Sequence, residues 1–160
     1  MIKIALCDDN EVERRLLRKI VTAVLQELHQ EVLIVEFSSG EKLQRNFSRG
    51  DYDLIFLDVF MKEMDGIATG RAIRKKDVKV EIILATGSDQ YLREGYELHA
   101  FAYLMKPYDV MQVRATICDY FSRNQVSTHD EDMEFLRFSV CKQSVDCLLV
   151  RGMLSFFQRM

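Results

Sequence analysis

Four consecutive apolar residues, Leu54 to Leu57, are followed directly by Asp58. An uninterrupted apolar run of this length is typical of a strand buried on both faces of a parallel sheet. An aspartate that ends such a strand stands at the carboxyl edge of the sheet, where open α/β folds bind their ligands. The run therefore predicts a central strand that carries a candidate functional carboxylate at its end.

Strand and helix signals alternate five times along about the first 123 residues. The expected strands, rich in apolar and β-branched residues, lie at residues 2–7, 32–37, 54–57, 81–86 and 102–105. Segments with helical character follow them at about residues 10–28, 39–47, 66–76, 91–98 and 109–121. Five successive βα units require a parallel sheet with right-handed crossovers and helices on both faces. The predicted fold class is therefore α/β, a doubly wound five-stranded parallel sheet with the flavodoxin-like order 2-1-3-4-5.

Two of the expected helices carry side-chain patterns that a structure can test. At the start of the first helix, Asn10 and Glu13 have the spacing of a capping box. Its apolar residues are expected on one helical face, namely Val12, Leu16, Leu17, Ile20, Val24 and Leu28. The third helix contains a basic run that is expected to be a solvated face, namely Arg71, Arg74, Lys75 and Lys76.

The composition is that of a globular protein and excludes several classes. Hydrophobic residues make up 48% and charged residues 29% of the 160 residues, so a sizeable core can be buried. A net charge of -3 gives no general attraction to nucleic acid. No long apolar segment is free of charges, and the N-terminal segment turns acidic too early for a secretory signal. The sequence therefore predicts a cytoplasmic protein without a membrane partner.

Polar residues stand at four of the expected strand ends, and these ends converge at one edge of a flavodoxin-like sheet. They are Asp8 and Asp9, Asp58, Thr86 and Lys106. Adjacent carboxylates repel one another unless a cation lies among them, and Mg²⁺ prefers such oxygen ligands. A carboxylate nucleophile, a divalent metal, a lysine and a hydroxyl together can accept a phosphoryl group. The pattern predicts that Asp58 becomes an aspartyl phosphate.

Each of these residues taken alone has a simpler interpretation. An acidic pair before a helix often only complements the helix dipole, and Thr86 could be an ordinary helix cap. A lysine followed by proline indicates no more than the end of a strand. Because each residue falls at a different strand end of one five-strand pattern, their combination favours a shared site.

Over about residues 1–123 the sequence resembles the receiver domain of bacterial two-component response regulators. The resemblance rests on Asp8 and Asp9, on Asp58 in LDVFMKEMDG, on Thr86, and on Lys106 in YLMKP. It implies that Asp58 is the phosphoacceptor, that Thr86 and Lys106 bind the phosphoryl group, and that Tyr103 is the switch aromatic. It also implies that Asp9, Asp58 and the backbone carbonyl of Phe60 hold Mg²⁺, with Asp8 acting through water.

The sequence departs from the usual pattern of this family at two positions. Lys62 stands where proline is usual, which is expected to loosen the loop after Asp58. Gly87 stands where a small residue such as alanine is common, which is expected to leave more room for the phosphoryl group. Neither departure removes a chemical group from the predicted site.

Residues 124–134 are expected to be a linker, and residues 135–160 the incomplete start of an output domain. Two β-rich segments, residues 135–140 and 145–150, suggest a hairpin that is similar to the opening strands of LytTR-type DNA-binding domains. A hairpin alone leaves apolar side chains uncovered. Self-association as a homodimer is therefore expected, and DNA binding only if the output domain is completed.

Three functions remain open from the sequence. The first is a response regulator that accepts a phosphoryl group from a sensor histidine kinase and switches an output, which we expect to be transcription. The second is a stand-alone receiver that acts by binding a protein. The third is a metal-dependent phosphatase with Asp58 as nucleophile, but such enzymes usually have a second acid where this chain has Phe60. We therefore expect a regulator and not an enzyme.

Overall fold

The computed structural model describes residues 1–62, 64–88 and 92–124 of the chain. The predicted linker, apart from Asn124, and the predicted output segment 135–160 lie outside the described residues. The chain divides into two units, Met1–Thr116 and Ile117–Met160, and the whole sheet lies in the first.

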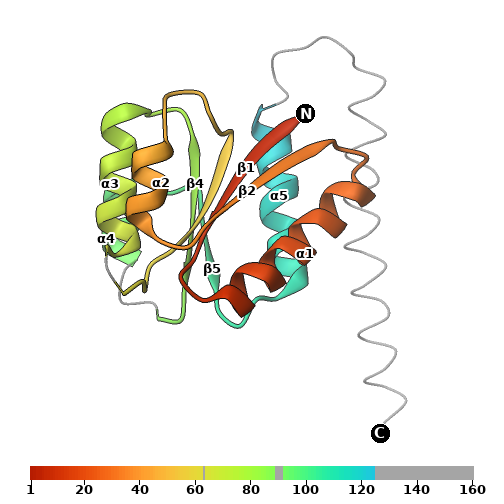
Figure 1. Ribbon diagram of the computed structural model, residues 1–160. Helices are drawn as coiled ribbons and strands as arrows, with labels where there is room; N and C mark the ends of the chain where they lie inside the picture. The colour runs from red at the N-terminus through yellow and green to blue at the C-terminus, as the bar shows by residue number, and fades with distance from the viewer. Residues whose placement is uncertain (63, 89–91, 125–160) are drawn as a thin grey trace, which may run out of the picture. The chain divides into compact units, whose positions relative to one another are not determined.

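Five strands alternate with five helices in the described residues, as the sequence predicts (Figure 1). They are β1 (Ile2–Cys7), α1 (Glu11–Glu27), β2 (Val32–Phe37), α2 (Gly40–Asn46), β3 (Leu54–Asp58), α3 (Gly66–Lys76), β4 (Glu81–Thr86), α4 (Leu92–Glu97), β5 (Ala102–Met105) and α5 (Val110–Asn124). All strand pairs are parallel and the sheet order is β2-β1-β3-β4-β5. The predicted fold class and strand order are confirmed.

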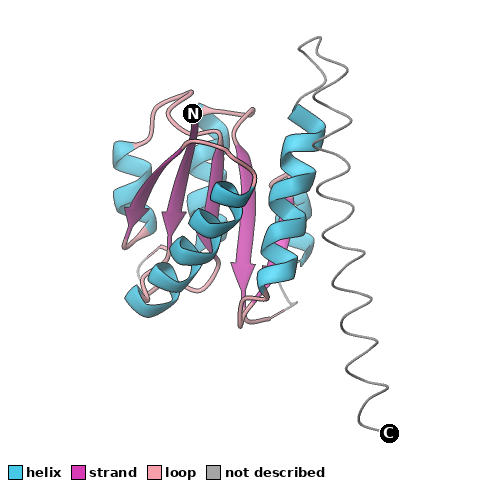
Figure 2. Ribbon diagram, turned by 90° about the vertical axis from the view of Figure 1, so that its right-hand side faces the viewer, coloured by secondary structure: helices cyan, strands magenta, loops and turns pink. Residues whose placement is uncertain are grey.

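Helices cover both faces of the sheet (Figures 1 and 2). In Figure 1, α2, α3 and α4 lie on one side, while α1 and the start of α5 lie on the other. β3 lies at the centre between β1 and β4, and all five of its residues are buried. Its uninterrupted apolar run is therefore explained, because each face of the strand meets a helical layer. No helix in the described part of the chain has both the length and the apolar character needed to cross a bilayer.

The buried face of α1 differs from the face that the sequence predicted. The buried residues are Leu17, Ile20, Val21, Val24 and Leu25. Val12 is 76% exposed and Leu16 is 46% exposed, so their placement on the core face was wrong. At roughly 100° per residue, both positions lie well away from the centre of the buried stripe. The first turns of α1 therefore present apolar side chains to solvent.

The basic run of α3 is not a uniformly solvated face, which corrects the prediction. The Arg74 guanidinium donates to the backbone carbonyls of Leu98 at 2.8 Å, His99 at 3.2 Å and Val80 at 2.5 Å. Lys76 Nζ donates to the carbonyls of Gln44 at 2.7 Å and Phe47 at 3.0 Å. Each of these hydrogen bonds gives a backbone carbonyl a donor from a charged side chain. They therefore connect α3 to the segments around it.

We expect Arg74→Lys to lower the free energy of unfolding by about 2 kcal/mol, because one ammonium cannot span three carbonyls that the planar guanidinium reaches together. Urea unfolding of the metal-free protein measures this change. The exposed neighbour Lys75 provides a control, since Lys75→Ala is expected to change stability by less than about 0.5 kcal/mol. Equal stability of the two variants would show that the Arg74 contacts add nothing.

Candidate functional site

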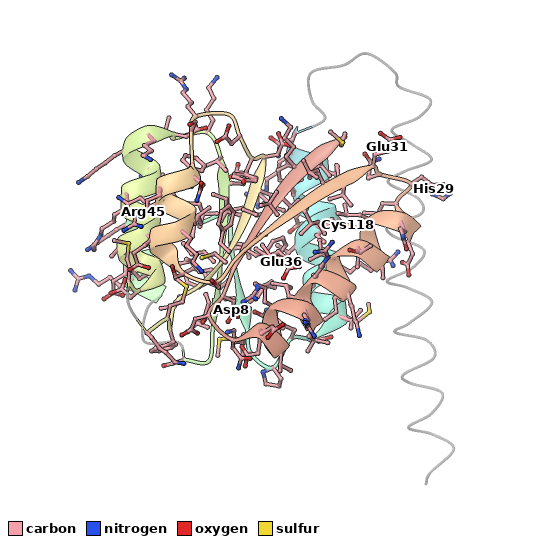
Figure 3. All side chains as sticks on the ribbon, in the orientation of Figure 1. Asp8, His29, Glu31, Glu36, Arg45 and Cys118 are labelled. Atoms are coloured by element: carbon pink, nitrogen blue, oxygen red, sulfur yellow. The ribbon has the colours of Figure 1, made fainter. Side chains whose placement is uncertain are left out.

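The register of the sheet brings the predicted site residues to one edge. Cys7 pairs with Leu57, so Asp8 follows β1 beside Asp58 at the end of β3. Thr86 at the end of β4 pairs with Met105 of β5, which places Lys106 directly after that pair. Figure 3 shows Asp8 at the edge of the sheet from which α1 begins. The convergence of strand ends that the sequence predicted is therefore confirmed.

Three carboxylates gather at this edge. One oxygen from each of Asp8, Asp9 and Asp58 lies within 4.8 Å of the other two. Asp8 is 3% exposed and Asp58 is 4% exposed, so two of these groups are buried. The Lys106 ammonium contacts Asp8 Oδ2 at 2.9 Å and Asp58 Oδ1 at 3.0 Å. Lys106 thus offsets part of the negative charge of the cluster.

Burial and charge act in opposite directions on Asp58. Burial raises the pKa of Asp58 to about 6, while Lys106 and the backbone N–H of Phe60 lower it and Asp8 raises it. Burial also lowers the pKa of Lys106, but its hydrogen bonds to Glu13 and Asp8 outweigh this, so that the net shift is upward. Lys106 therefore stays protonated and positively charged. Its charge only partly offsets the cost of burying the ionised Asp58 carboxylate.

The loop after β3 is attached to the acidic cluster by its backbone. The N–H of Lys62 donates to Asp9 Oδ2 at 3.1 Å, and the N–H of Phe60 donates to Asp58 Oδ1 at 3.3 Å. A proline at position 62 could not make the first of these bonds, because it has no N–H. The departure that was expected to loosen this loop therefore supplies an anchor for it.

Thr86 and Tyr103 lie on the same face of the sheet, two positions apart in the β4–β5 register. The Thr86 hydroxyl is buried and closes its own turn, since it donates to the carbonyl of Ser88 at 2.9 Å and accepts from its N–H at 3.1 Å. Tyr103 packs against Gly95 of α4, where an added Cβ would lie 1.4 Å from the tyrosine oxygen. Thr86 directly follows Ala85, the partner of Asp58 in the sheet, whereas Tyr103 pairs with Leu84 further from the edge. Asp8, Asp58 and Lys106 are joined by direct contacts.

Sequence reasoning missed the role of Glu13. Asn10 caps α1 as predicted, because its side-chain oxygen accepts from the N–H groups of Val12 at 3.0 Å and Glu13 at 3.4 Å. The reciprocal half of the capping box is absent from this turn: the N–H of Asn10 donates to Asp8 Oδ1 at 2.8 Å, and the Glu13 carboxylate pairs with Lys106. Capping-box spacing was thus a signal for a residue that reaches the site.

Arg14 is a second residue that the sequence analysis did not select. Its Nη1 donates to the backbone carbonyl of Asp8 at 2.6 Å, and its Nε bonds Glu36 Oε2 of β2 at 3.1 Å. Figure 3 labels Asp8 and Glu36, the two residues that Arg14 connects. Arg18 also pairs with Glu36, and its hydrogen bond is the main reason that the pKa of Glu36 is lowered. This bridge fixes the backbone from which the Asp8 carboxylate projects.

Comparison with known proteins agrees with this fold. The family model described as the response regulator receiver domain matches residues 4–118. The transcriptional regulatory protein NatR of Bacillus subtilis is 30% identical over 124 residues, which cover 77% of this chain and 51% of NatR. The sensory transduction protein LytT of Bacillus anthracis is 25% identical over 125 residues, covering 78% of this chain and 49% of LytT. This chain thus spans about half the length of these two relatives.

A solved structure shows the same fold. The receiver domain of AraT, a response regulator from Geobacillus stearothermophilus, superposes with a TM-score of 0.64 at 26% identity, covering 76% of this chain and 94% of that domain. The doubly wound sheet with the order β2-β1-β3-β4-β5 is the fold that this chain shares with the AraT receiver domain. The chain belongs to the response regulator receiver domain family.

Proposed function

We propose that this protein is a switch of a two-component system in which Asp58 accepts a phosphoryl group from a sensor histidine kinase. The observation that carries the proposal is the contact of Lys106 with both Asp58 and Asp8 at the end of the central strand. An oxygen of Asp58 attacks phosphorus while the bond from phosphorus to the donor breaks, and the donor leaves with the electron pair. Lys106 then binds an oxygen of the transferred group.

The donor set at this edge fits Mg²⁺. Three carboxylate oxygens within 4.8 Å of one another, two of them from buried side chains, are hard ligands of the kind that this ion prefers. Asp9, Asp58 and the backbone carbonyl of Phe60 would hold it directly, and Asp8 through water. When bound, the ion neutralises negative charge on the phosphoryl group during transfer. Asp58 also becomes easier to ionise beside a cation.

We further propose that the output is transcription, by a domain that begins after the linker at residues 124–134. NatR, which is named as a transcriptional regulatory protein, and LytT are about twice as long as the matched segment. Residues 135–160 would belong to a LytTR-like domain, and DNA binding would depend on that domain. Homodimerisation and a cytoplasmic location belong to the same proposal. A stand-alone receiver acting by protein binding is the alternative.

Incubation with acetyl phosphate and Mg²⁺ followed by intact-mass measurement tests the proposed function. We expect one added phosphoryl group, and none when EDTA removes the metal. Peptide mapping after borohydride reduction would then locate the group at Asp58. Absence of the added mass with both acetyl phosphate and a phosphorylated histidine kinase domain would refute the proposal.

Thr86→Ala is expected to accept the phosphoryl group but to lose the conformational response. In the structure the hydroxyl is bonded to Ser88, so it must exchange that partner for a phosphoryl oxygen, and this exchange biases the two states. Hydrogen exchange over residues 92–103, with and without phosphorylation, measures the response. Thr86→Ser keeps the hydroxyl and is the control. The same protection change in Thr86→Ala as in the parent would assign Thr86 only to its turn.

A further inference from the structure

Glu13, which lies outside the acidic cluster, places a third carboxylate on the Lys106 ammonium. Its side chain is 37% exposed, whereas that of Lys106 is 14% exposed. Glu13 therefore lies on the solvent side of Lys106, and we call this side the mouth of the site. Lys106 contacts three carboxylates at once, namely those of Asp8, Asp58 and Glu13.

The single Lys106 ammonium cannot pair fully with three carboxylates and a phosphoryl group at the same time. Phosphorylation of Asp58 adds anionic oxygens that must bind Lys106 while Glu13 still contacts it. Among the interactions that raise the pKa of Lys106, the hydrogen bond to Glu13 is the largest. The Tyr108 ring lies 5.9 Å from Lys106 Nζ, and the Tyr108 hydroxyl is buried. The Tyr108 ring therefore borders the ammonium on one side.

A purely structural role for Glu13 has to be considered, because acids in the first turn stabilise a helix. Glu11 provides that stabilisation from the same turn and pairs with Arg15 at 2.5 Å on the surface. Glu13 differs from Glu11 in its partner, because it crosses to the residue after β5. The comparison of these two glutamates separates the helix effect from the effect on Lys106.

We propose that Glu13 is a positioning residue that competes with the phosphoryl group for Lys106 and so restrains phosphorylation of Asp58. The inference rests on the proposed function and adds its regulation. In the unphosphorylated protein Glu13 holds the ammonium near the mouth of the site. It also repels the anionic donor as it approaches. Loss of its charge releases Lys106 for the incoming group.

The test compares Glu13→Gln with Glu11→Gln in the full chain, since each removes one negative charge from the first turn of α1. With acetyl phosphate and Mg²⁺, the phosphoryl group moves to Asp58 and acetate leaves. We expect Glu13→Gln to raise the rate at limiting donor by about threefold to fivefold, the range for one partly exposed ion pair. Beryllofluoride, which mimics the phosphoryl group, should bind more tightly by a similar factor. Glu11→Gln should leave both quantities unchanged.

A direct readout distinguishes failure of this inference from failure of the proposed function. The Lys106 side-chain NMR signal of the unphosphorylated protein should shift in Glu13→Gln and not in Glu11→Gln. Glu13→Asp, which keeps the charge on a shorter side chain, should behave in the rate assay between wild type and Glu13→Gln. If Asp58 is phosphorylated equally fast in both Gln variants, the competition by Glu13 is refuted while the proposed function stands. If Asp58 is phosphorylated in no variant, the proposed function and this inference are both overturned.

Discussion

Asp58→Asn is expected to abolish phosphoryl transfer to this chain, with no added mass after incubation with acetyl phosphate and Mg²⁺. An amide is a poor nucleophile, and the neighbouring carboxylates cannot replace it, because Asp8 is buried against Lys106 and Asp9 is bonded to the Lys62 backbone. Intact mass of wild type and variant side by side is the measurement. Phosphorylation of the variant to the wild-type extent would remove Asp58 from its proposed role.

The same substitution is expected to stabilise the metal-free protein, so unfolding is not expected to cause the loss of transfer. Burial raises the pKa of Asp58 from 3.8 to about 6, so the folded state binds a proton more tightly than the unfolded chain does. Stability contributed by the protonated group is present below pH 4 and is lost as pH rises to about 6. At pH 7 Asp58→Asn should therefore raise the free energy of unfolding by about 2 kcal/mol. At pH 4 the increase should be much smaller.

Urea unfolding in EDTA at both pH values measures this gain. The sign of the change in the free energy of unfolding at pH 7 tests this expectation. An Asn variant less stable than wild type would mean that the Lys106 contact outweighs the cost of burying the Asp58 carboxylate. Added Mg²⁺ should stabilise wild type more than the variant, because the variant lacks one anionic ligand.

Gly66→Ala is expected to lower the free energy of unfolding by roughly 3 kcal/mol and to disturb the phosphorylation site. A Cβ at Gly66 would lie 2.1 Å from the carbonyl oxygen of Asp58, 2.8 Å from its carbonyl carbon and 2.9 Å from Val59 Cα. These are backbone atoms, so no side chain can turn aside to relieve the overlap. The start of α3 would have to separate from the end of β3, and Asp58 would move with it.

Gly87→Ala is the matched control, because a Cβ at Gly87 meets no atom within 4 Å. We expect it to fold with wild-type stability and to accept the phosphoryl group. Urea unfolding and the intact-mass assay apply to both variants. Equal stability of Gly66→Ala and wild type would show that the backbone yields at little cost. The open space at Gly87 also means that alanine, the residue common in the family, would fit there.

The sequence was sufficient to predict the fold, because strands, helices and turns are each indicated by residues close together in the chain. Strand and helix segments were recognised from apolar runs, helical periodicity and turn residues, and the parallel order follows from βα connections. The cluster of Asp8, Asp58 and Lys106 could be predicted for the same reason. Each residue directly follows or ends a strand, and parallel strands bring their carboxyl ends to one edge.

Only the tertiary structure decided how the long charged side chains pair. The local sequence pattern predicted that Glu13 belonged to a helix cap and Arg74 to a solvated face, but their partners Lys106 and Leu98 lie far along the chain. It also placed Val12 in the core, although the layer above the sheet leaves it exposed. A sequence pattern identifies the face on which a side chain lies, whereas its partner depends on which distant elements approach that face. The acidic edge of this protein was therefore determined by its sequence, and the partners of Lys106 by its packing.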